Sequence, residues 1–270
     1  MQNAGNVDTA LAGAAKKIEA VYEAPYLSHA PMEPMNATAQ ITADGVDVWT
    51  SCQIQSVAQS MAARIAGVPD AKVRIHTQYL GGGFGRRGGG DFVGEAVEIA
   101  KHTNGAPVKL TWTREDDMTH DNYRPASYVK FNAGLGADGL PTAVTATVAC
   151  PAFGPTGQNG VDGNAVDGIF NAPYKFAALK VDAHHPDTGV PCTYWRSVGY
   201  SQNTYFMESF VDEMAAAAGQ DPVEYRRKLL NSPRALAVLN LAAEKADWGK
   251  ALPAGRARGV AVVNNIGSFN

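Results

Sequence analysis

The chain has 270 residues and a formal net charge of −3 at pH 7, and 45% of its residues are hydrophobic. This length suffices for one large domain or two smaller ones with a buried core. The slightly acidic balance gives no sign of a nucleic-acid-binding surface, and no apolar run is as long as a membrane span.

The first residues and the cysteines bear on the cellular compartment. Met1 is followed by small and polar residues, without the basic and apolar regions of a signal peptide. Cys52, Cys150 and Cys192 are far apart and form no CxxC motif, so we expect reduced thiols and no zinc site. These features favour a reducing compartment, but the bacterial cytoplasm and the periplasm both stay open.

Residues 1–20 are mostly small and polar, and we expect them to be disordered or frayed. The next segment contains three closely spaced prolines, which exclude a helix and predict an ordered, extended loop. His29 and Glu33 lie in this loop. They either anchor it through hydrogen bonds or serve a function.

The next stretch predicts a hairpin and then a helix. Residues 37–50 contain two strand-like runs that flank Asp44-Gly45, a strong hairpin signal. Residues 54–66 predict a helix whose buried stripe is formed by Val57, Met61 and Ile65 and widened by Ala58 and Ala62.

A βαβ unit is predicted to follow. Its parts are a strand over 72–80, a glycine-rich loop over 81–91, a helix over 92–102 with Asp91 as its N-cap, and a strand over 108–112. The loop then lies at the carboxyl end of the first strand, where open α/β sheets bind ligands.

The glycine-rich loop is the most unusual part of the sequence. Without Cβ atoms its backbone can adopt φ > 0 and bring bare amides close to a ligand, although a flexible surface turn is the alternative. Gly-Lys-Ser/Thr is absent, which excludes a P-loop. Gly83–Gly88 has the spacing of a dinucleotide fingerprint, but the acidic residue expected about twenty positions later is missing. Binding of NAD or FAD therefore stays an alternative. Arg86 and Arg87 are expected either to contact an anion or to be solvated.

Two other polar motifs are weaker candidates for chemistry. Arg114–Asp117 is either a solvated turn or helix N-terminus, or a paired-carboxylate site, and nothing apolar in the sequence around it would shift a pKa. His184 and His185 are adjacent on a predicted strand and point to opposite faces, so we do not expect them to share a metal ion.

The second half of the chain predicts a hairpin and two helices. The hairpin pairs 128–135 with 142–149, and a Gly/Asn/Asp-rich loop follows over 151–168. One helix ends at Gly219, and the next begins at Pro222 after a capping motif. The last residues, 259–270, begin a strand, which suggests a fragment of a longer polypeptide. We expect an α+β fold of layered mixed sheets with helices on one face.

Five stretches together resemble a known family. They are residues 24–36 (APYLSHAPMEPMN), 49–53, 80–87, 112–117 and 195–203. In this order they resemble the large molybdenum-binding subunit of the xanthine dehydrogenase and aldehyde oxidase family, nearest to the branch typified by the isoquinoline 1-oxidoreductase beta subunit. The resemblance covers nearly the whole chain. It implies that 21–270 are part of a molybdenum cofactor-binding region, with subdomains expected over 21–150 and 151–270.

The resemblance also implies a cofactor and its contacts. The cofactor is molybdenum–molybdopterin, expected in its cytosine dinucleotide form. Gln53 would hold the apical oxo ligand of the metal through its amide, and Arg196 would face the other side of the metal. The residues expected against the metal–pterin centre are Gly82, Gly83, Phe84 and Gly85. Bare amides suit the acceptor-rich pterin and phosphate groups, and the pterin supplies the sulfur ligands, so no protein ligand to the metal is needed.

The family's reaction hydroxylates an N-heteroaromatic compound or an aldehyde with water as the oxygen source. Its general-base Glu would lie beyond Asn270, so the resemblance implies an oxidoreductase whose isolated fragment is inactive. Electrons leaving the metal imply a small iron–sulfur partner subunit. Gly88 and Val198 replace a Glu and an aromatic residue of the xanthine-oxidising branch, which argues against xanthine as the substrate. The alternative outside enzymes is a structural module that binds no cofactor by itself.

Overall fold

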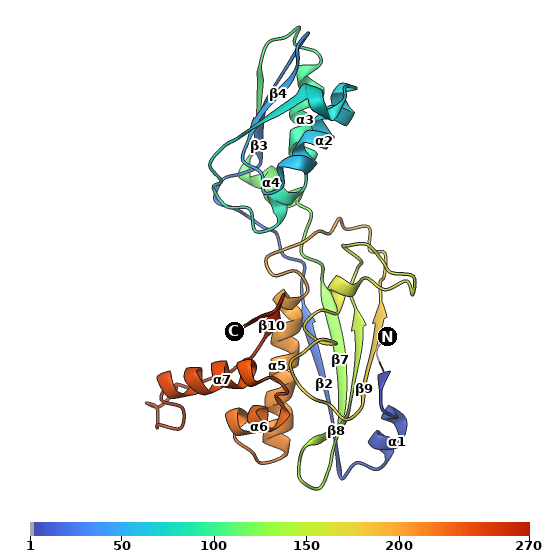
Figure 1. Ribbon diagram of the computed structural model, residues 1–270, viewed down its shortest axis with the longest axis vertical. Coiled ribbons are helices and arrows are strands. Elements are labelled where there is room, and N and C mark those ends of the chain that lie inside the picture. Colours follow the sequence, from blue (N-terminus) through green and yellow to red (C-terminus); the bar gives the residue numbers. More distant parts are fainter. Residues whose placement is uncertain (1–2) are drawn as a thin grey trace. The chain divides into compact units, whose positions relative to one another are not determined.

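The computed structural model describes residues 3–270, which form two compact units that alternate along the chain (Figure 1). Unit 1 contains residues 3–25, Pro125–Thr188 and Ser197–Asn270, and unit 2 contains Tyr26–Arg124 and Gly189–Arg196. Each unit has its own hydrophobic core. The expected subdomain boundary after residue 150 coincides with none of the points where the chain passes between the units, since residue 150 lies inside unit 1.

Unit 1 is built on a five-stranded sheet with the strand order β1-β9-β8-β7-β2. Its strands are β1 Asn3–Ala4, β2 Lys16–Ala24, β7 Ser127–Leu135, β8 Pro141–Ala149 and β9 Leu179–His184. β7 and β8 form the predicted hairpin, and β8 and β9 run parallel. Helix α5 (Tyr200–Ala217) packs on one face of this sheet, where the Phe210 ring stacks on Phe131 with 4.8 Å between their centroids.

The beginning of the chain is ordered from residue 3 onward, so the expectation of a frayed start is wrong for 3–20; residues 1 and 2 lie outside the described residues. Asn6 caps helix α1 (Val7–Ala12), which buries Val7 against Ala143. Strand β2 pairs with β7 along its whole length. Composition alone suggested disorder here. Strand β2 alternates charged and apolar residues, and such a strand becomes stable only when its apolar residues pack on the core, which composition does not reveal.

The last part of unit 1 contains two more helices and a short hairpin. They are α6 Pro222–Leu229, α7 Pro233–Lys245, β10 Asn264–Asn265 and β11 Ser268–Phe269. Asp221 caps α6 as predicted, accepting hydrogen bonds from the Val223 and Glu224 amides at 2.9 and 3.0 Å. The sequence analysis missed α7, and the strand expected over 259–270 is this short hairpin.

Unit 2 is built on a four-stranded sheet with the strand order β5-β4-β3-β6. Its elements are β3 Asn36–Thr42, β4 Gly45–Thr50, α2 Gln55–Ala66, β5 Val73–Thr77, α3 Asp91–Ala100, β6 Val108–Thr111 and α4 Arg114–Thr119. The predicted hairpin at Asp44-Gly45 joins β3 to β4, and α2 connects β4 to β5, which lie side by side and parallel. Helices α2 and α3 share one hydrophobic core with the sheet.

Three local expectations for unit 2 need correction. β6 pairs with β3, so the strand–loop–helix–strand unit spans the sheet and does not join neighbouring strands. Asp91 is the first residue of α3, and Gly90 occupies the N-cap. In α2 the predicted Ala58, Ala62 and Ile65 do pack in the core, together with Ala63, whereas the predicted Val57 is 38% exposed. Small side chains let the helix lie close to α3 and the sheet.

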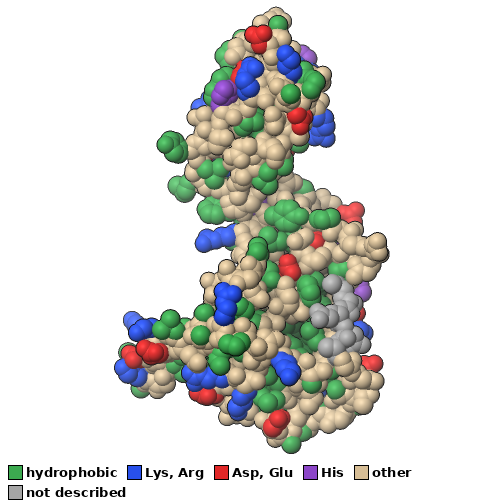
Figure 2. Space-filling model, in the orientation of Figure 1, with side chains coloured by type: hydrophobic (Ala, Val, Ile, Leu, Met, Phe, Trp, Pro, Cys, Tyr) green, Lys and Arg blue, Asp and Glu red, His purple; other side chains and the backbone are tan. Residues whose placement is uncertain are grey.

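The fold class is confirmed, since both units are α+β layers in which helices cover a mixed sheet. The short α1 is the exception, because it covers the opposite face of the unit 1 sheet from α5. It packs on Ala143 of β8, whereas Val144 and Ala146, which point to the other face, belong to the core under α5. On the face shown in Figure 2, Lys and Arg side chains are interspersed with Asp and Glu. Among residues 3–270 no helix has both the length and the apolar character needed to cross a membrane.

Candidate functional site

The glycine loop, residues 81–90 of unit 2, connects β5 to α3 and contains three residues with positive φ angles. These are +96° at Gly82, +56° at Phe84 and +111° at Gly85. Glycine adopts such angles readily and phenylalanine rarely does, so the surroundings must hold Phe84 in this conformation. The Phe84 side chain is 44% exposed and lies against Gly82. The loop therefore presents an aromatic ring to solvent from a constrained backbone.

Three consecutive amides of this loop have no hydrogen-bond acceptor within the described part of the chain, although Gly83 is buried, Gly82 is half-buried and only Phe84 is exposed. The neighbouring amides are bonded: Gly81 donates to Glu33 Oε2 at 2.8 Å, and Gly85 donates to Gln53 Oε1 at 3.0 Å. The N–H groups of Gly82, Gly83 and Phe84 have no acceptor among the described residues. Backbone donors without an acceptor bind water or an acceptor-rich ligand.

Gln53 lies beside the loop with a defined orientation. Because its Oε1 accepts the Gly85 N–H, its Nε2 carries the two amide donors and has no acceptor among residues 3–270. A Cβ atom at Gly83 would lie 2.5 Å from Gln53 Oε1, so only glycine fits there. Gln53 and the loop thus form one surface that displays hydrogen-bond donors.

Arg87 holds the glycine loop from the interior of unit 2. Its guanidinium is fully buried and donates to the carbonyls of Gly82 at 2.9 Å, Glu33 at 2.7 Å, and Ser51 and Pro34 at 3.1 Å each. Burial lowers the pKa of this guanidinium, and the nearby Glu33 carboxylate only partly opposes that shift. Arg87 therefore joins the glycine loop to the proline-rich loop and to the end of β4.

Glu33 is the second anchor of the loop. Its carboxylate accepts from Ser51 and Asn36 in addition to Gly81. Burial raises the pKa of this carboxyl, but the hydrogen bonds lower it by more, so the pKa lies below its ordinary value. Of the two readings of Glu33 left open by the sequence, the geometry supports the loop anchor.

Arg86 is buried as well, so neither arginine is solvated, and the anions that they contact are carboxylates of this chain. Its side chain is 1% exposed and donates to both Asp91 oxygens at 2.8 and 2.7 Å. Its Nε lies 2.9 Å from Asp121 Oδ1, and its guanidinium lies over the Trp112 ring. The Asp91 carboxylate already occupies the N-terminus of α3, where a dinucleotide would place its pyrophosphate, so this geometry does not support NAD or FAD binding.

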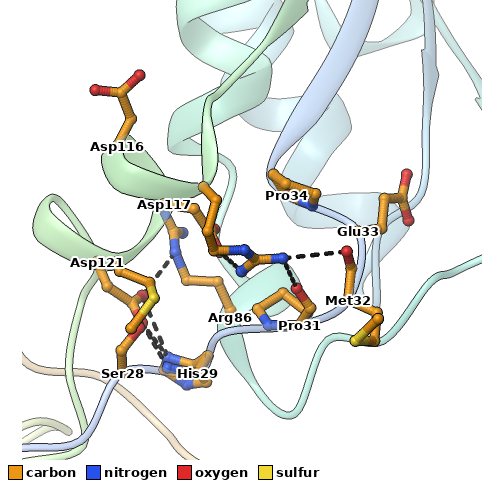
Figure 3. Close-up of polar contacts among 12 residues, drawn as sticks. Ser28, His29, Pro31, Met32, Glu33, Pro34, Arg86, Asp116, Asp117 and Asp121 are labelled. Carbon is orange, nitrogen blue, oxygen red and sulfur yellow. Dashed lines mark hydrogen bonds and ion pairs between the residues drawn. The ribbon is translucent and has the colours of Figure 1, made fainter.

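His29 connects the proline-rich loop to Asp121, which lies near the end of the segment Tyr26–Arg124 (Figure 3). Its Nδ1 lies 3.1 Å from Asp121 Oδ2, and its Nε2 lies 2.9 Å from the carbonyl oxygen of Tyr194. Asp121 also accepts from the Ser28 hydroxyl at 2.8 Å and from the His29 amide at 2.6 Å. Burial raises the pKa of the Asp121 carboxyl, but the bonds from His29 outweigh it and the net direction is down. His29 is thus a satisfied anchor of the proline-rich loop.

The segment 189–196 brings Arg196 to the same unit. It is held by backbone bonds to Tyr123, which donates to Pro191 and accepts from Thr193. The Tyr194 carbonyl packs so closely on Gly85 that a Cβ there would lie 1.9 Å from its oxygen. Arg196 follows two residues later with an exposed side chain. The structure thus brings together Gln53, the glycine loop and, through Tyr194, the segment that carries Arg196.

The weaker candidates have structural roles. Thr113 and Asp116 form a capping box at the start of α4, so the reading as a helix N-terminus holds. Asp117 is buried, and burial raises the pKa of its carboxyl despite Arg114, contrary to the expectation that nothing there would shift a pKa. In unit 1, His185 bonds to the Cys150 carbonyl at 2.8 Å. No group of three or more His, Cys, Asp or Glu within residues 3–270 is placed to hold a metal ion.

Sequence reasoning missed Asp121 and the burial of both arginines. Asp121 lies 92 positions from His29, and no local motif marks it. The Arg-Arg pair between glycines was visible, but Arg87 bonds mainly to backbone carbonyls, which leave no trace in a sequence, and Arg86 pairs with Asp91 and with the distant Asp121. The one sequence feature that pointed to these anchors was the expected order of the proline-rich loop, and the bonds from Arg87 to its carbonyls account for that order.

The site as a whole suits a ligand rich in hydrogen-bond acceptors. It contains three backbone N–H groups without an acceptor among residues 3–270, of which that of Gly83 belongs to a buried residue, the Gln53 amide donors and an exposed aromatic ring, all within unit 2. A Cβ at Gly83 would clash with Gln53, and one at Gly85 would clash with the Tyr194 carbonyl, so the shape of the site requires both glycines. These donors suit the acceptor-rich pterin and oxo groups of a molybdenum cofactor.

Comparison with known proteins gives consistent matches. The molybdopterin cofactor-binding domain family matches residues 1–230. The beta subunit of isoquinoline 1-oxidoreductase from Brevundimonas diminuta is 35% identical over 230 residues, covering 81% of this chain and 29% of that protein. A nicotinate dehydrogenase subunit from Pseudomonas putida is 30% identical over 254 residues, covering 90% of this chain and 21% of that protein.

Solved structures share the fold at lower sequence identity. Quinoline 2-oxidoreductase from Pseudomonas putida 86 has a TM-score of 0.77 at 18% identity, covering 91% of this chain and 34% of that one. Aldehyde oxidoreductase from Desulfovibrio gigas has a TM-score of 0.76 at 18% identity, covering 91% of this chain and 29% of that one. The chain thus spans only 21% to 34% of the length of these four proteins.

Proposed function

The chain belongs to the molybdopterin cofactor-binding domain family, and from this premise we propose that Gln53 and the glycine loop form one wall of a molybdenum cofactor pocket. The observation that carries the proposal is the row of unpaired donors, formed by the amides of Gly82, Gly83 and Phe84 and by Gln53 Nε2. When bound, the cofactor supplies the two-electron redox chemistry. The residues of this chain bind and orient it.

Each proposed contact has a physical role. Gln53 donates from Nε2 to an oxo group, since its own oxygen is already occupied by the Gly85 amide. Phe84 covers the cofactor with its exposed ring and excludes water from that side. Arg196 supplies an exposed guanidinium from the segment next to Gly85, and a guanidinium suits acceptor or anionic groups.

We extend the proposal to the protein of which this chain is a part. Relatives named for isoquinoline, nicotinate and aldehyde oxidation support hydroxylation of an N-heteroaromatic compound or an aldehyde. The small residue Gly88 favours a bulkier heteroaromatic ring or an aldehyde over xanthine. The general-base Glu is expected beyond Asn270, so the chain alone is expected to be inactive. An iron–sulfur partner subunit and the cytosine dinucleotide form of the cofactor belong to the same proposal.

Metal analysis tests the assignment. Molybdenum is measured by mass spectrometry in the 270-residue chain and in the longer polypeptide that this proposal assumes. Metal in the longer form alone would support a pocket completed by other segments. Metal in neither would overturn the cofactor assignment.

A pair of glutamine variants tests the role of Gln53. Gln53→Glu replaces two donors by a negatively charged acceptor, and we expect the molybdenum content of the longer polypeptide to fall by about tenfold. Gln55→Glu is the matched control, since Gln55 is exposed two positions away at the start of α2. Equal molybdenum content in both variants would contradict the role of Gln53.

A further inference from the structure

The network around His29 has a feature that the proposed cofactor contacts do not use. The His29 side chain is 0% exposed, and the side chain of its partner Asp121 is 1% exposed. Each ring nitrogen lies within hydrogen-bond distance of one oxygen partner, with Asp121 at Nδ1 and the Tyr194 carbonyl at Nε2. A carboxylate and a carbonyl can only accept hydrogen bonds.

The two acceptors determine which protons the ring carries. In a neutral imidazole one nitrogen keeps a lone pair, which would face an acceptor at about 3 Å with no proton between them. Turning the ring over would place carbon atoms against both acceptors and leave a buried carboxylate and a buried carbonyl without their partner. An arrangement in which both nitrogens donate, as in an imidazolium, satisfies both acceptors.

The two bonds of this ring join parts of the candidate site. Through Nε2, His29 holds the Tyr194 carbonyl against the Cα of Gly85. Tyr194 lies two residues before Arg196, and Gly85 directly follows Phe84. Through Asp121, it shares a carboxylate with Arg86, which follows Gly85 in the glycine loop. The contact of Tyr194 with Gly85 is thus fixed from both sides by one buried charge network.

We propose that His29 is a positioning residue: a buried imidazolium that holds the Tyr194 carbonyl against Gly85 and thereby sets the placement of Arg196 relative to Phe84. The consequence for cofactor binding rests on the proposed function. The protonation state and the local order of residues 189–196 do not rest on it. The groups facing the ring are Asp121, Ser28, the Tyr194 carbonyl and, beyond Asp121, Arg86.

Nitrogen-15 NMR of the labelled 270-residue chain tests the protonation state directly. Long-range proton–nitrogen spectra distinguish a ring with two protonated nitrogens from either neutral tautomer, and His29→Gln assigns the signal. We expect the pattern of two protonated nitrogens for His29 at neutral pH. A neutral pattern would overturn the proposal. In Asp121→Asn, which removes the paired charge and keeps the shape, we expect the two-proton pattern to be lost.

Hydrogen exchange tests the positioning. In His29→Gln we expect amides of 189–196 and of the glycine loop to exchange about ten- to a hundredfold faster, because one charge-assisted bond is lost. Exchange in α2 should not change. The control is His102→Gln, which alters a histidine of unit 2 whose side chain is 77% exposed. Unchanged exchange in 189–196, or an equal rise throughout unit 2, would contradict a positioning role.

The two proposals can fail separately. Molybdenum content that does not respond to Gln53→Glu, together with a doubly protonated His29, would overturn the cofactor contact and leave the positioning role in place. A neutral His29, together with a molybdenum content that depends on Gln53, would overturn only the positioning role.

Discussion

Two buried arginines, Arg226 of unit 1 and Arg87 of unit 2, bind different kinds of partner, whereas Arg86 of unit 2 pairs with carboxylates as Arg226 does. In unit 1, Arg226 contacts two acidic side chains, Glu208 at 3.0 Å and Asp212 at 2.5 Å. In unit 2, Arg87 donates mainly to backbone carbonyls, and its one acidic contact is Glu33 at 3.2 Å. Burial lowers the pKa of both guanidinium groups, but Tyr174 and Glu208 reverse the direction for Arg226 and raise its pKa.

The difference shows two uses of a buried charge. Arg226 joins side chains of helices α5 and α6, which already share an apolar core. Arg87 fixes loops whose glycines have no side chains to pack, so hydrogen bonds to carbonyls replace apolar contacts. The conformation that displays the bare amides therefore depends on polar anchors. Four predictions test this contrast, from the largest expected effect to the smallest.

Removing Arg226 should have the largest effect on stability. Arg226→Ala leaves Glu208 buried without its cation, and we expect the free energy of unfolding to fall by about 3–5 kcal/mol. Urea unfolding of the chain measures this. The control is Arg227→Ala on the same helix, whose ion pair with Glu224 is partly exposed and should cost less than about 1 kcal/mol. Similar losses in both variants would show that the charge pair does not stabilise unit 1.

Adding one carbon at Gly85 should disrupt the loop of unit 2. Gly85→Ala places a Cβ 1.9 Å from the Tyr194 oxygen at a φ of +111°, and we expect a cost of about 2–4 kcal/mol. Gly88→Ala is the control in the same loop, since its Cβ would lie 3.6 Å from Ile54 and its φ is not positive. Thermal unfolding compares the two. A stable Gly85→Ala variant would mean that the Tyr194 contact is not close in solution.

Replacing each buried arginine by lysine should separate the two uses of charge. Lysine keeps the cation but has three donors and no planar fork, so Arg87→Lys should leave buried carbonyls unpaired and cost about 2 kcal/mol. Arg226→Lys still pairs with carboxylates and should cost about 1 kcal/mol. Urea unfolding gives both values. The contrast between the units fails if the order is reversed.

An exposed ion pair should give the smallest effect. Bonds from Arg74 and His76 hold the pKa of Asp47 at about 2, below its ordinary value, although partial burial opposes them. A carboxyl with a lowered folded-state pKa stabilises the protein above the unfolded-state pKa and loses that contribution as the pH falls from about 4 to 2. Because Arg74 is half exposed, we expect only about 1 kcal/mol.

Unfolding in urea between pH 5 and pH 2 measures this contribution. Asp47→Asn should flatten the pH dependence of unfolding in that range, because the variant has no carboxyl to titrate at this position. An unchanged slope would show that the pair contributes nothing.

Much of the fold could be predicted because its signals are local. Asp44-Gly45 and Asp138-Gly139 both mark hairpins, and Asp221-Pro222 marks the start of α6. The strand order could not be predicted, because the pairing of β6 with β3 depends on contacts distant in sequence. The predicted stripe in α2 was right for Ala58, Ala62 and Ile65 and wrong for Val57, since close packing on α3 and the sheet selected the small residues.

The candidate site divides in the same way. The glycine loop stands out because its composition has few other uses, and Gln53 was found only through a family resemblance. The geometry adds a reason for Gln53, since the Gly85 amide fixes which end of its side chain donates outward. Asp121 could not be predicted, because its partners His29 and Arg86 come from separate segments and its role exists only after folding.

The interleaving of the two units has a consequence for the order of folding during synthesis. Strand β2 leaves the ribosome before unit 2 but pairs with β7, which follows it, so β2 waits without its partner while residues 26–124 emerge. Most of unit 2 can fold in that interval from nearby contacts. Its last piece, Gly189–Arg196, arrives only after β9. We therefore expect the contact between Tyr194 and Gly85 to form late, and a nascent chain arrested before residue 189 to hold an ordered sheet beside an unfinished site.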